Sequence, residues 1–274
     1  MIEDKEKAYP NFLQGLLLTI CLMIILLSSW LVGFYPLRLQ IHLPEFYIPL
    51  VTLIASVFCI PIVYYALKKS KINLLKDLYF PNLKFLTIIL LLAISIKILS
   101  QPIISPVRFF HSFSNGQFES LFFKSIRFDL AFSIRIFHTI ILGPVIEEVF
   151  FRRILLNQFL KRYKAIFALF LSAILFTIYH CDPNIIWFLF FYGLIYGYIF
   201  YKTYSLIACI LFHSSTNLLA YITQAGSMPI NDNTLGRLFF LFAGSIICIY
   251  VFEKYTAWFQ NRELFKDEKN NFGA

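Results

Sequence analysis

Eight apolar stretches divide this sequence, and each is close to the length that a helix needs to cross a lipid bilayer. A span takes about 20 residues that are mostly apolar. Inside the hydrocarbon a backbone must satisfy its own hydrogen bonds, which favours helices over open-edged strands. We therefore predict an all-α, polytopic transmembrane helical bundle of about eight spans. The expected spans are residues 13–34, 46–67, 85–106, 133–158, 165–181, 184–201, 204–222 and 237–257.

The composition agrees with a membrane protein. Of the 274 residues, 59% are hydrophobic and 14% are charged, which excludes a disordered chain and an ordinary soluble enzyme. No polar stretch is long enough to form a second soluble domain. We therefore predict a single integral membrane domain over residues 1–274, in contact with the lipid bilayer.

The basic residues predict how the chain is oriented. Most of them fall in loops that would share one side of the bundle, and the positive-inside rule assigns that side to the cytoplasm. We therefore predict a multi-pass protein of the cell membrane with both termini in the cytoplasm. Because these residues cluster between apolar segments, the net charge of +9 does not indicate a nucleic-acid partner. The basic residues on the side predicted to be cytoplasmic are Lys68, Lys69, Lys71, Lys76, Lys84, Lys161, Arg162, Lys164, Lys202, Arg262, Lys266 and Lys269.

Two acidic residues lie side by side inside the fourth expected span. A carboxylate at membrane depth costs on the order of several kcal/mol, so Glu147 and Glu148 indicate a functional site. On an α-helix, Glu148 shares a face with Arg152, four residues later, whereas Glu147 is turned about 100° away. We predict that Arg152 neutralises Glu148 and that Glu147 stays free to face a partner.

Two further polar groups lie on other expected spans. Phe176 and His180 end the fifth span, and His213 and Asn217 lie in the seventh. Each pair is four residues apart and therefore shares a helix face, so Phe176 can pack under the ring of His180. If the three helices converge, Glu147, His180, His213 and Asn217 line one internal catalytic cavity.

Such a cavity would suit hydrolysis of a peptide bond. A carboxylate held among imidazoles can take a proton from water as a general base. His213 and Asn217 could donate hydrogen bonds to the oxyanion, while His180 orients the water or protonates the leaving amine. Two histidines and Glu147 are also a zinc-type ligand set, although the HExxH motif is absent. A divalent metal such as zinc therefore stays an open alternative, and we assign no residue to a metal.

The connection between the third and fourth spans, residues 105–129, mixes aromatic, aliphatic and basic residues irregularly. We interpret it as an interfacial helix. A lid that contacts the substrate is the alternative.

Glu147-Glu148-xxx-Arg152, Phe176-xxx-His180 and His213-xxx-Asn217, in this order, resemble the motifs of the CPBP family. This is the family of CAAX prenyl endopeptidases and bacterial Abi-type intramembrane proteases. The likeness covers residues 134–221, which would form the protease core.

The resemblance implies a membrane endopeptidase that cleaves a peptide or protein substrate in or at the membrane. Glu147, His180, His213 and Asn217 match its catalytic residues, and Glu148, Arg152 and Phe176 its supporting ones. A non-catalytic membrane protein that binds a peptide, such as a bacteriocin self-immunity factor, is the second hypothesis. A proton-coupled transporter is the third, although no inverted repeat is visible. The substrate, its cleavage site, the biological pathway and the oligomeric state stay open.

Overall fold

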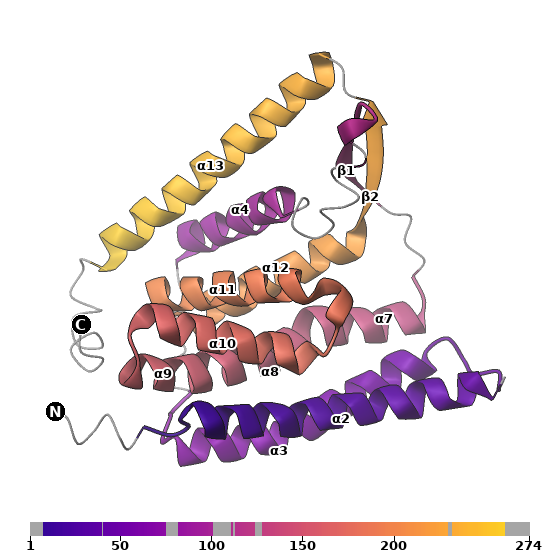
Figure 1. Ribbon diagram of the computed structural model, residues 1–274, viewed down its shortest axis with the longest axis vertical. Coiled ribbons are helices and arrows are strands. Elements are labelled where there is room, and N and C mark those ends of the chain that lie inside the picture. Colours follow the sequence, from indigo (N-terminus) through magenta and orange to yellow (C-terminus); the bar gives the residue numbers. More distant parts are fainter. Residues whose placement is uncertain are drawn as a thin grey trace.

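A computed structural model of the protein describes residues 8–39, 41–74, 82–100, 111, 113–123, 128–229 and 232–260. Within these ranges the chain forms eight long helical units (Figure 1). Seven of them contain one main helix: α2 Phe12–Arg38, α3 Tyr47–Lys69, α4 Leu83–Leu99, α10 Ala165–His180, α11 Ile186–Thr203, α12 Leu206–Ile222 and α13 Asp232–Gln260. The other unit runs through α7 Leu130–Ile136, η2 Phe137–Leu142, α8 Gly143–Glu148, η3 Val149–Leu156 and α9 Asn157–Arg162. The predicted polytopic helical bundle is confirmed.

Four of these units are long and apolar enough to cross a membrane by themselves. They are Phe12–Gly33, Tyr47–Lys69, Leu130–Arg162 and Phe239–Ala257. Two others, α10 and α12, are apolar but have only 16 and 17 residues. At 1.5 Å per residue they are about 24–26 Å long, shorter than a hydrocarbon core of about 30 Å. The prediction of eight spans therefore has the right order and number of helices, whereas a smaller set has full spanning length.

Short polar residues begin several of these helices. Asn82 precedes α4, and its side chain accepts a hydrogen bond from the backbone N–H of Phe85 at 2.9 Å. Asp129 does the same for α7 through the N–H of Phe132 at 2.7 Å. Ser205 caps α12 through Ala208 at 3.2 Å. These caps satisfy N–H groups that have no partner within a helix, and they set where each helix begins.

A tight connection joins α10 to α11 in a helical hairpin, at the gap between the fifth and sixth expected spans. Cys181 ends α10 in the left-handed conformation with φ of 48°, and a short turn, η4 Pro183–Ile185, leads into α11. The two helices then pack closely at Gly193. A Cβ atom there would lie 3.2 Å from the Cα of Ala173 and 3.3 Å from the ring of Phe176. A glycine at this position lets α11 approach the helix that carries His180.

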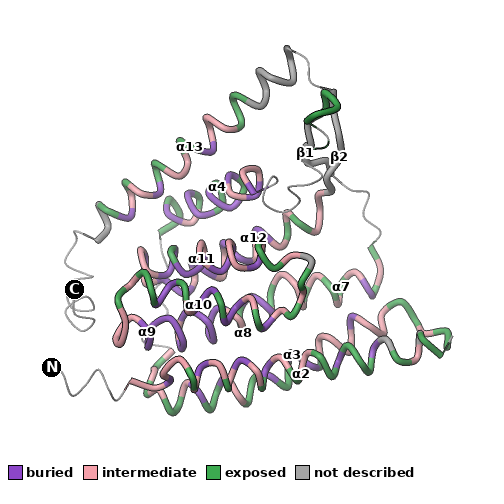
Figure 2. Tube along the Cα trace, viewed as in Figure 1, coloured by how far each residue is buried: buried purple, intermediate pink, exposed green. Residues whose placement is uncertain are grey.

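The interior of the bundle surrounds the unit Leu130–Arg162. Figure 2 shows buried residues concentrated on α8 to α12, whereas α2, α3 and α13 alternate between buried and exposed positions. Six apolar side chains of this central unit have 0% exposure: Phe150, Phe151, Ile154, Leu155, Leu156 and Phe159. The two acidic residues therefore lie in the most buried part of the fold, with α10, α11 and α12 on one side and α3 on the other.

A two-stranded ribbon is the main departure from the predicted structure. Strands β1 Gln117–Phe123 and β2 Thr223–Pro229 pair antiparallel, with Ser120 opposite Gly226. The described part of residues 105–129 thus contains a strand where an interfacial helix was predicted. The reason is pairing: β2 continues directly from α12 and presents its backbone to β1, a long-range contact that local sequence patterns do not report.

The helix ends alternate between two sides of the molecule. The start of α2, the α9–α10 connection, the α11–α12 connection and the end of α13 lie together on the left in Figure 1. Contacts on this side agree with that arrangement. Arg162 donates a hydrogen bond to the backbone oxygen of Ala8 at 2.8 Å, and Lys202 pairs with Glu253 at 3.0 Å. The cytoplasmic location of this side stays a prediction.

Candidate active site

The helix that carries the two acidic residues changes its hydrogen-bonding register on both sides of them. Phe137–Leu142 and Val149–Leu156 are π-helical, and the short α-helical segment Gly143–Glu148 lies between them. A π-helical turn bonds residue i to i+5 instead of i+4 and so rotates the side chains that follow it. Glu147 and Glu148 therefore lie on a segment whose orientation is set by π turns before and after it.

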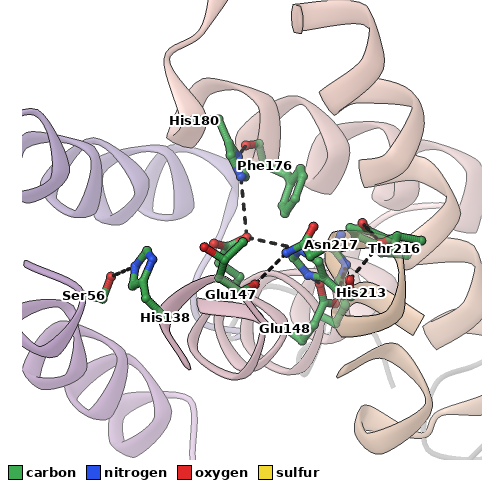
Figure 3. Close-up of polar contacts among 12 residues, drawn as sticks. Ser56, His138, Glu147, Glu148, Phe176, His180, His213, Thr216 and Asn217 are labelled. Atoms are coloured by element: carbon green, nitrogen blue, oxygen red, sulfur yellow. Dashed lines mark hydrogen bonds and ion pairs between the residues drawn. The ribbon is translucent and has the colours of Figure 1, made fainter. Parts of the chain in front are cut away.

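Glu148 is the buried member of the pair. Its side chain has 0% exposure, and its Oε2 lies 3.1 Å from Nε of Arg152, which is also fully buried. This contact confirms the predicted Glu148–Arg152 pair. The other oxygen, Oε1, accepts a hydrogen bond from Nδ1 of His213 at 2.8 Å (Figure 3). Glu148 thus binds one cation of its own helix and one imidazole of α12.

Aromatic rings enclose the Arg152 guanidinium. Its central carbon lies 4.7 Å from the ring centroid of Phe176 and 5.3 Å from that of Tyr196. Its two terminal nitrogens have no hydrogen-bond partner among the described residues. Cation–π contact with the ring faces therefore stabilises a charge that would otherwise be poorly solvated.

Glu147 is the accessible member of the pair. Its side chain is 14% exposed, and its Oε2 lies 3.7 Å from Nε2 of His180 and 3.9 Å from Nε2 of His213. This oxygen has no hydrogen-bond partner among the residues that the structure describes. Figure 3 shows the two imidazoles approaching Glu147 from different helices, α10 and α12.

Both histidines direct the same nitrogen towards Glu147. His180 Nδ1 lies 2.8 Å from the backbone oxygen of Phe176, and His213 Nδ1 lies 2.8 Å from the Glu148 carboxylate. Since a carbonyl and a carboxylate can only accept, each Nδ1 must donate. A neutral imidazole then carries a lone pair at Nε2. Two lone pairs and one carboxylate oxygen therefore converge, an arrangement that can bind a proton or the hydrogens of water.

The ring of Phe176 joins these groups. Its centroid lies 4.5 Å from that of His180 and 6.1 Å from that of His213, and its face contacts Arg152. Tyr196 stacks on His213 at 4.4 Å with 25° between the planes. Packing on these two rings limits the rotation of the imidazoles, in addition to the hydrogen bonds at Nδ1.

Asn217 lies one turn beyond His213 on α12. Its Nδ2 donates a hydrogen bond to the backbone oxygen of Thr139 at 2.9 Å, which connects α12 to the π-helical segment before Glu147. An amide has two N–H groups, and one of them remains for a ligand.

All four residues that were predicted to be catalytic line one cavity of about 670 Å³. Its wall also includes apolar residues of α2 and α11, among them Trp30, which is 61% exposed, and Phe188. A volume of this size accommodates a peptide segment or a comparable ligand. The four polar groups thus lie in a cavity whose lining is mostly apolar.

Sequence reasoning missed a second polar pair in this cavity. Nε2 of His138 lies 2.7 Å from Oγ of Ser56 on α3, and both residues line the cavity. This contact is an interhelical hydrogen bond of the kind that intramembrane histidines commonly form. The position of His138 near Glu147 was not expected. The two residues are nine positions apart, and at about 100° per residue an α-helix would place them on roughly opposite sides.

The described residues contain no group of three His, Cys, Asp or Glu side chains that is arranged to hold a metal ion. The two Nε2 atoms and Glu147 Oε2 do approach one another, but as an acceptor set around a single oxygen. We therefore derive no step through a metal.

Comparison with protein families gives a match to part of the chain. Residues 129–219 match the family described as type II CAAX prenyl endopeptidase Rce1-like. The matched segment contains the helix with Glu147, the α10–α11 hairpin, and α12 as far as Leu219, which includes Asn217. Comparisons with curated proteins and with solved structures gave no match.

Proposed function

We propose that this chain is a membrane endopeptidase of the CAAX-type (CPBP) intramembrane protease family, which its match over residues 129–219 supports. In this proposal the chain hydrolyses its substrate with Glu147 as general base. The whole chain acts as one integral membrane domain, with residues 134–221 as its catalytic core. The substrate is a peptide or protein in or at the membrane. One observation supports this most strongly: Nε2 of His180 and Nε2 of His213 both face Glu147 Oε2, at 3.7 and 3.9 Å, with both Nδ1 atoms engaged elsewhere.

The first step is attack by water. Glu147 takes a proton from a water molecule, and the water oxygen forms a bond to the carbonyl carbon of the scissile peptide. The carbonyl oxygen becomes an oxyanion. His213, when it carries a proton at Nε2, and the second N–H of Asn217 donate hydrogen bonds to that oxygen. Both groups come from α12, one helical turn apart, so they reach the oxyanion from the same wall.

The second step is loss of the amine. The bond between carbon and nitrogen breaks, and the nitrogen receives a proton from Glu147 directly or through His180. His180 suits this transfer because its side chain is 26% exposed and borders the cavity. The first products are a carboxylic acid and an amine, which become a carboxylate and an ammonium when one proton passes between them, and Glu147 regains its ionised form. The proton transfers of both steps require only groups of the chain, the substrate and water.

Glu148 and Arg152 act through His213. The Glu148 carboxylate holds the imidazole with Nδ1–H towards itself and Nε2 towards Glu147. Arg152 supplies the positive charge that makes a fully buried carboxylate tolerable. The pair therefore orients a catalytic group and stays outside the reaction itself.

The test is hydrolysis by the purified full chain in proteoliposomes. The probes are internally quenched peptides with an apolar C-terminal segment, with and without an S-farnesylated cysteine, in water enriched in ¹⁸O. We expect ¹⁸O in the new carboxylate and a rate lower by at least about 10³-fold for Glu147→Gln. The rate should not change when the metal chelator 1,10-phenanthroline is added. Glu45→Gln, a change at an exposed loop carboxylate, is the matched control and should keep the wild-type rate.

Cleavage by Glu147→Gln at the wild-type rate would show that this mechanism is wrong. A binding-only role has a different signature. Cells that express Glu147→Gln would then keep protection against a peptide toxin, since binding does not require a general base.

A further inference from the structure

One backbone carbonyl beside the site lacks the partner that a regular helix would give it. In an α-helix the carbonyl of residue i accepts from the N–H of residue i+4. In the π-helical segment Phe137–Leu142 the bonds run to i+5, and the N–H of Gly143 donates to the oxygen of His138. Gly143 is therefore not the donor for Thr139.

Pro144 removes the next donor. In the π register the carbonyl of Thr139 would accept from residue 144, but proline has no backbone N–H. The carbonyl of Thr139 thus remains open to a partner from outside the helix. The Nδ2 atom of Asn217 fills this position at 2.9 Å.

This contact sets the orientation of the Asn217 side chain. A carbonyl oxygen only accepts, so the amide must present nitrogen, not oxygen, to Thr139. With one N–H held there, the amide plane is fixed, and the second N–H remains available to a ligand in the cavity that Asn217 lines. Figure 3 shows Asn217 beside Glu147 and His213.

The residue before the proline is also constrained. A Cβ atom at Gly143 would lie 3.0 Å from the oxygen of His138, which is the acceptor of the π bond. It would also lie 3.7 Å from Oε1 of Glu147. Glycine therefore fits this register best, and Gly143 and Pro144 together specify the register that leaves Thr139 open.

We infer that Pro144 is a positioning residue: by withholding a backbone N–H from the Thr139 carbonyl, it reserves that carbonyl as the anchor for the catalytic amide of Asn217. The role of the amide in the reaction rests on the proposed function. The anchoring itself is a property of the fold and can be measured separately.

The kinetic test is Pro144→Ala in the full chain, assayed with the quenched peptides. An alanine supplies the missing N–H, so the Thr139 carbonyl gains a backbone donor and Asn217 loses its anchor. We expect kcat to fall by roughly 10–100-fold with little change in KM. The temperature of unfolding should be unchanged or higher, because a helix gains a hydrogen bond. A residue with a merely structural role would show the opposite, a loss of stability.

Two further variants test whether Pro144 acts through Asn217. Pro61→Ala changes an exposed proline inside α3, away from the cavity lining, and should leave kcat unchanged. Asn217→Ala should lower kcat by about 10²–10³-fold, and Pro144→Ala should add no further loss in that background. If the two effects multiply, or if Pro144→Ala alone keeps wild-type kcat, the inference is wrong.

A readout without catalysis separates this inference from the proposed function. In protein labelled with ¹⁵N-asparagine, the side-chain amide signal of Asn217, assigned by its loss in Asn217→Ala, should be protected from solvent exchange. Pro144→Ala should remove that protection, whereas Pro61→Ala should not. An unprotected amide in the wild type would overturn the anchoring. A chain that shows the protection but no Glu147-dependent hydrolysis would instead overturn the proposed function.

Discussion

Glu147 and Glu148 are adjacent in the chain, yet the fold gives them opposite surroundings. Glu148 is fully buried and contacts Arg152 at 3.1 Å and His213 at 2.8 Å. Glu147 is partly exposed to the cavity, and its nearest ring nitrogens lie 3.7 and 3.9 Å from Oε2. A rotation of about 100° around one helix separates a carboxylate that is held in place from one that is free to exchange a proton.

This contrast divides the site into two parts. The closed part consists of Glu148, Arg152, His213 and the ring of Tyr196, all with at most 4% exposure. The open part consists of Glu147 and His180, which border the cavity. Removing a group from the closed part should lower both stability and rate, whereas removing one from the open part should lower the rate alone. The predictions below test this division.

Glu148→Gln should have the largest combined effect. It leaves the Arg152 guanidinium buried without a counter-charge, and breaking a buried pair in this way costs about 3–5 kcal/mol. Thermal unfolding of the purified chain in detergent measures this loss. The rate should fall as well, because His213 loses the carboxylate that orients it.

Glu147→Gln is the matched control for that experiment. It removes a charge from the neighbouring position but breaks no pair as close as 3.5 Å among the described residues. Its temperature of unfolding should therefore equal that of the wild type. If both substitutions destabilise the chain equally, the two carboxylates are not divided as the geometry indicates.

The two histidines extend the comparison to other helices. His213→Ala and His180→Ala should each lower the rate by about 10²–10⁴-fold. Only His213→Ala should also destabilise the fold, by about 1–3 kcal/mol, since it leaves a buried Glu148 oxygen without its donor. Rates and unfolding measured on the same preparations separate the two effects. Equal stability of the two variants would contradict the division.

Much of the fold could be predicted from the lengths of the apolar stretches. Each of the eight expected stretches contains a helical unit, because burying a backbone in lipid leaves few other structures. The β1–β2 ribbon could not be predicted in this way. It depends on two segments about 100 residues apart, and its short strands lack a clear alternating pattern.

Local spacing predicted part of the site, and contacts between helices supplied the rest. The Glu148–Arg152 pair follows from a separation of four residues. The bond from His213 to Glu148 joins residues 65 apart, and the bond from Asn217 to Thr139 joins residues 78 apart. Such contacts depend on how helices cross, which spacing within one helix does not determine.

The π-helical segments explain why the position of His138 in the cavity was not predicted from the sequence. An α-helical wheel places His138 on the side opposite Glu147, yet both residues line one cavity. Four of the residues between them, 139–142, belong to the wider π register, which turns the helix less per residue. The glycine and proline that accompany this register, Gly143 and Pro144, are visible in the sequence. Their effect on the register becomes clear only with the backbone hydrogen bonds.

Tyr196→Phe should have the smallest effect and tests where the closed part ends. Thr216 donates its hydroxyl hydrogen to the backbone oxygen of His213 at 2.8 Å, so the hydroxyl of Tyr196 must be the donor in their 2.9 Å contact. Removing that hydroxyl costs about 0.5–1.5 kcal/mol of stability but leaves the ring stacked on His213. The rate should therefore stay within about threefold of the wild type. Tyr192→Phe, which removes a comparable bond to Ser100 at 3.1 Å, is the control for loss of a buried tyrosine hydroxyl. A rate for Tyr196→Phe as low as that of His213→Ala would mean that the hydroxyl takes part in proton transfer. Tyr196 would then be a catalytic residue and not only a support for His213.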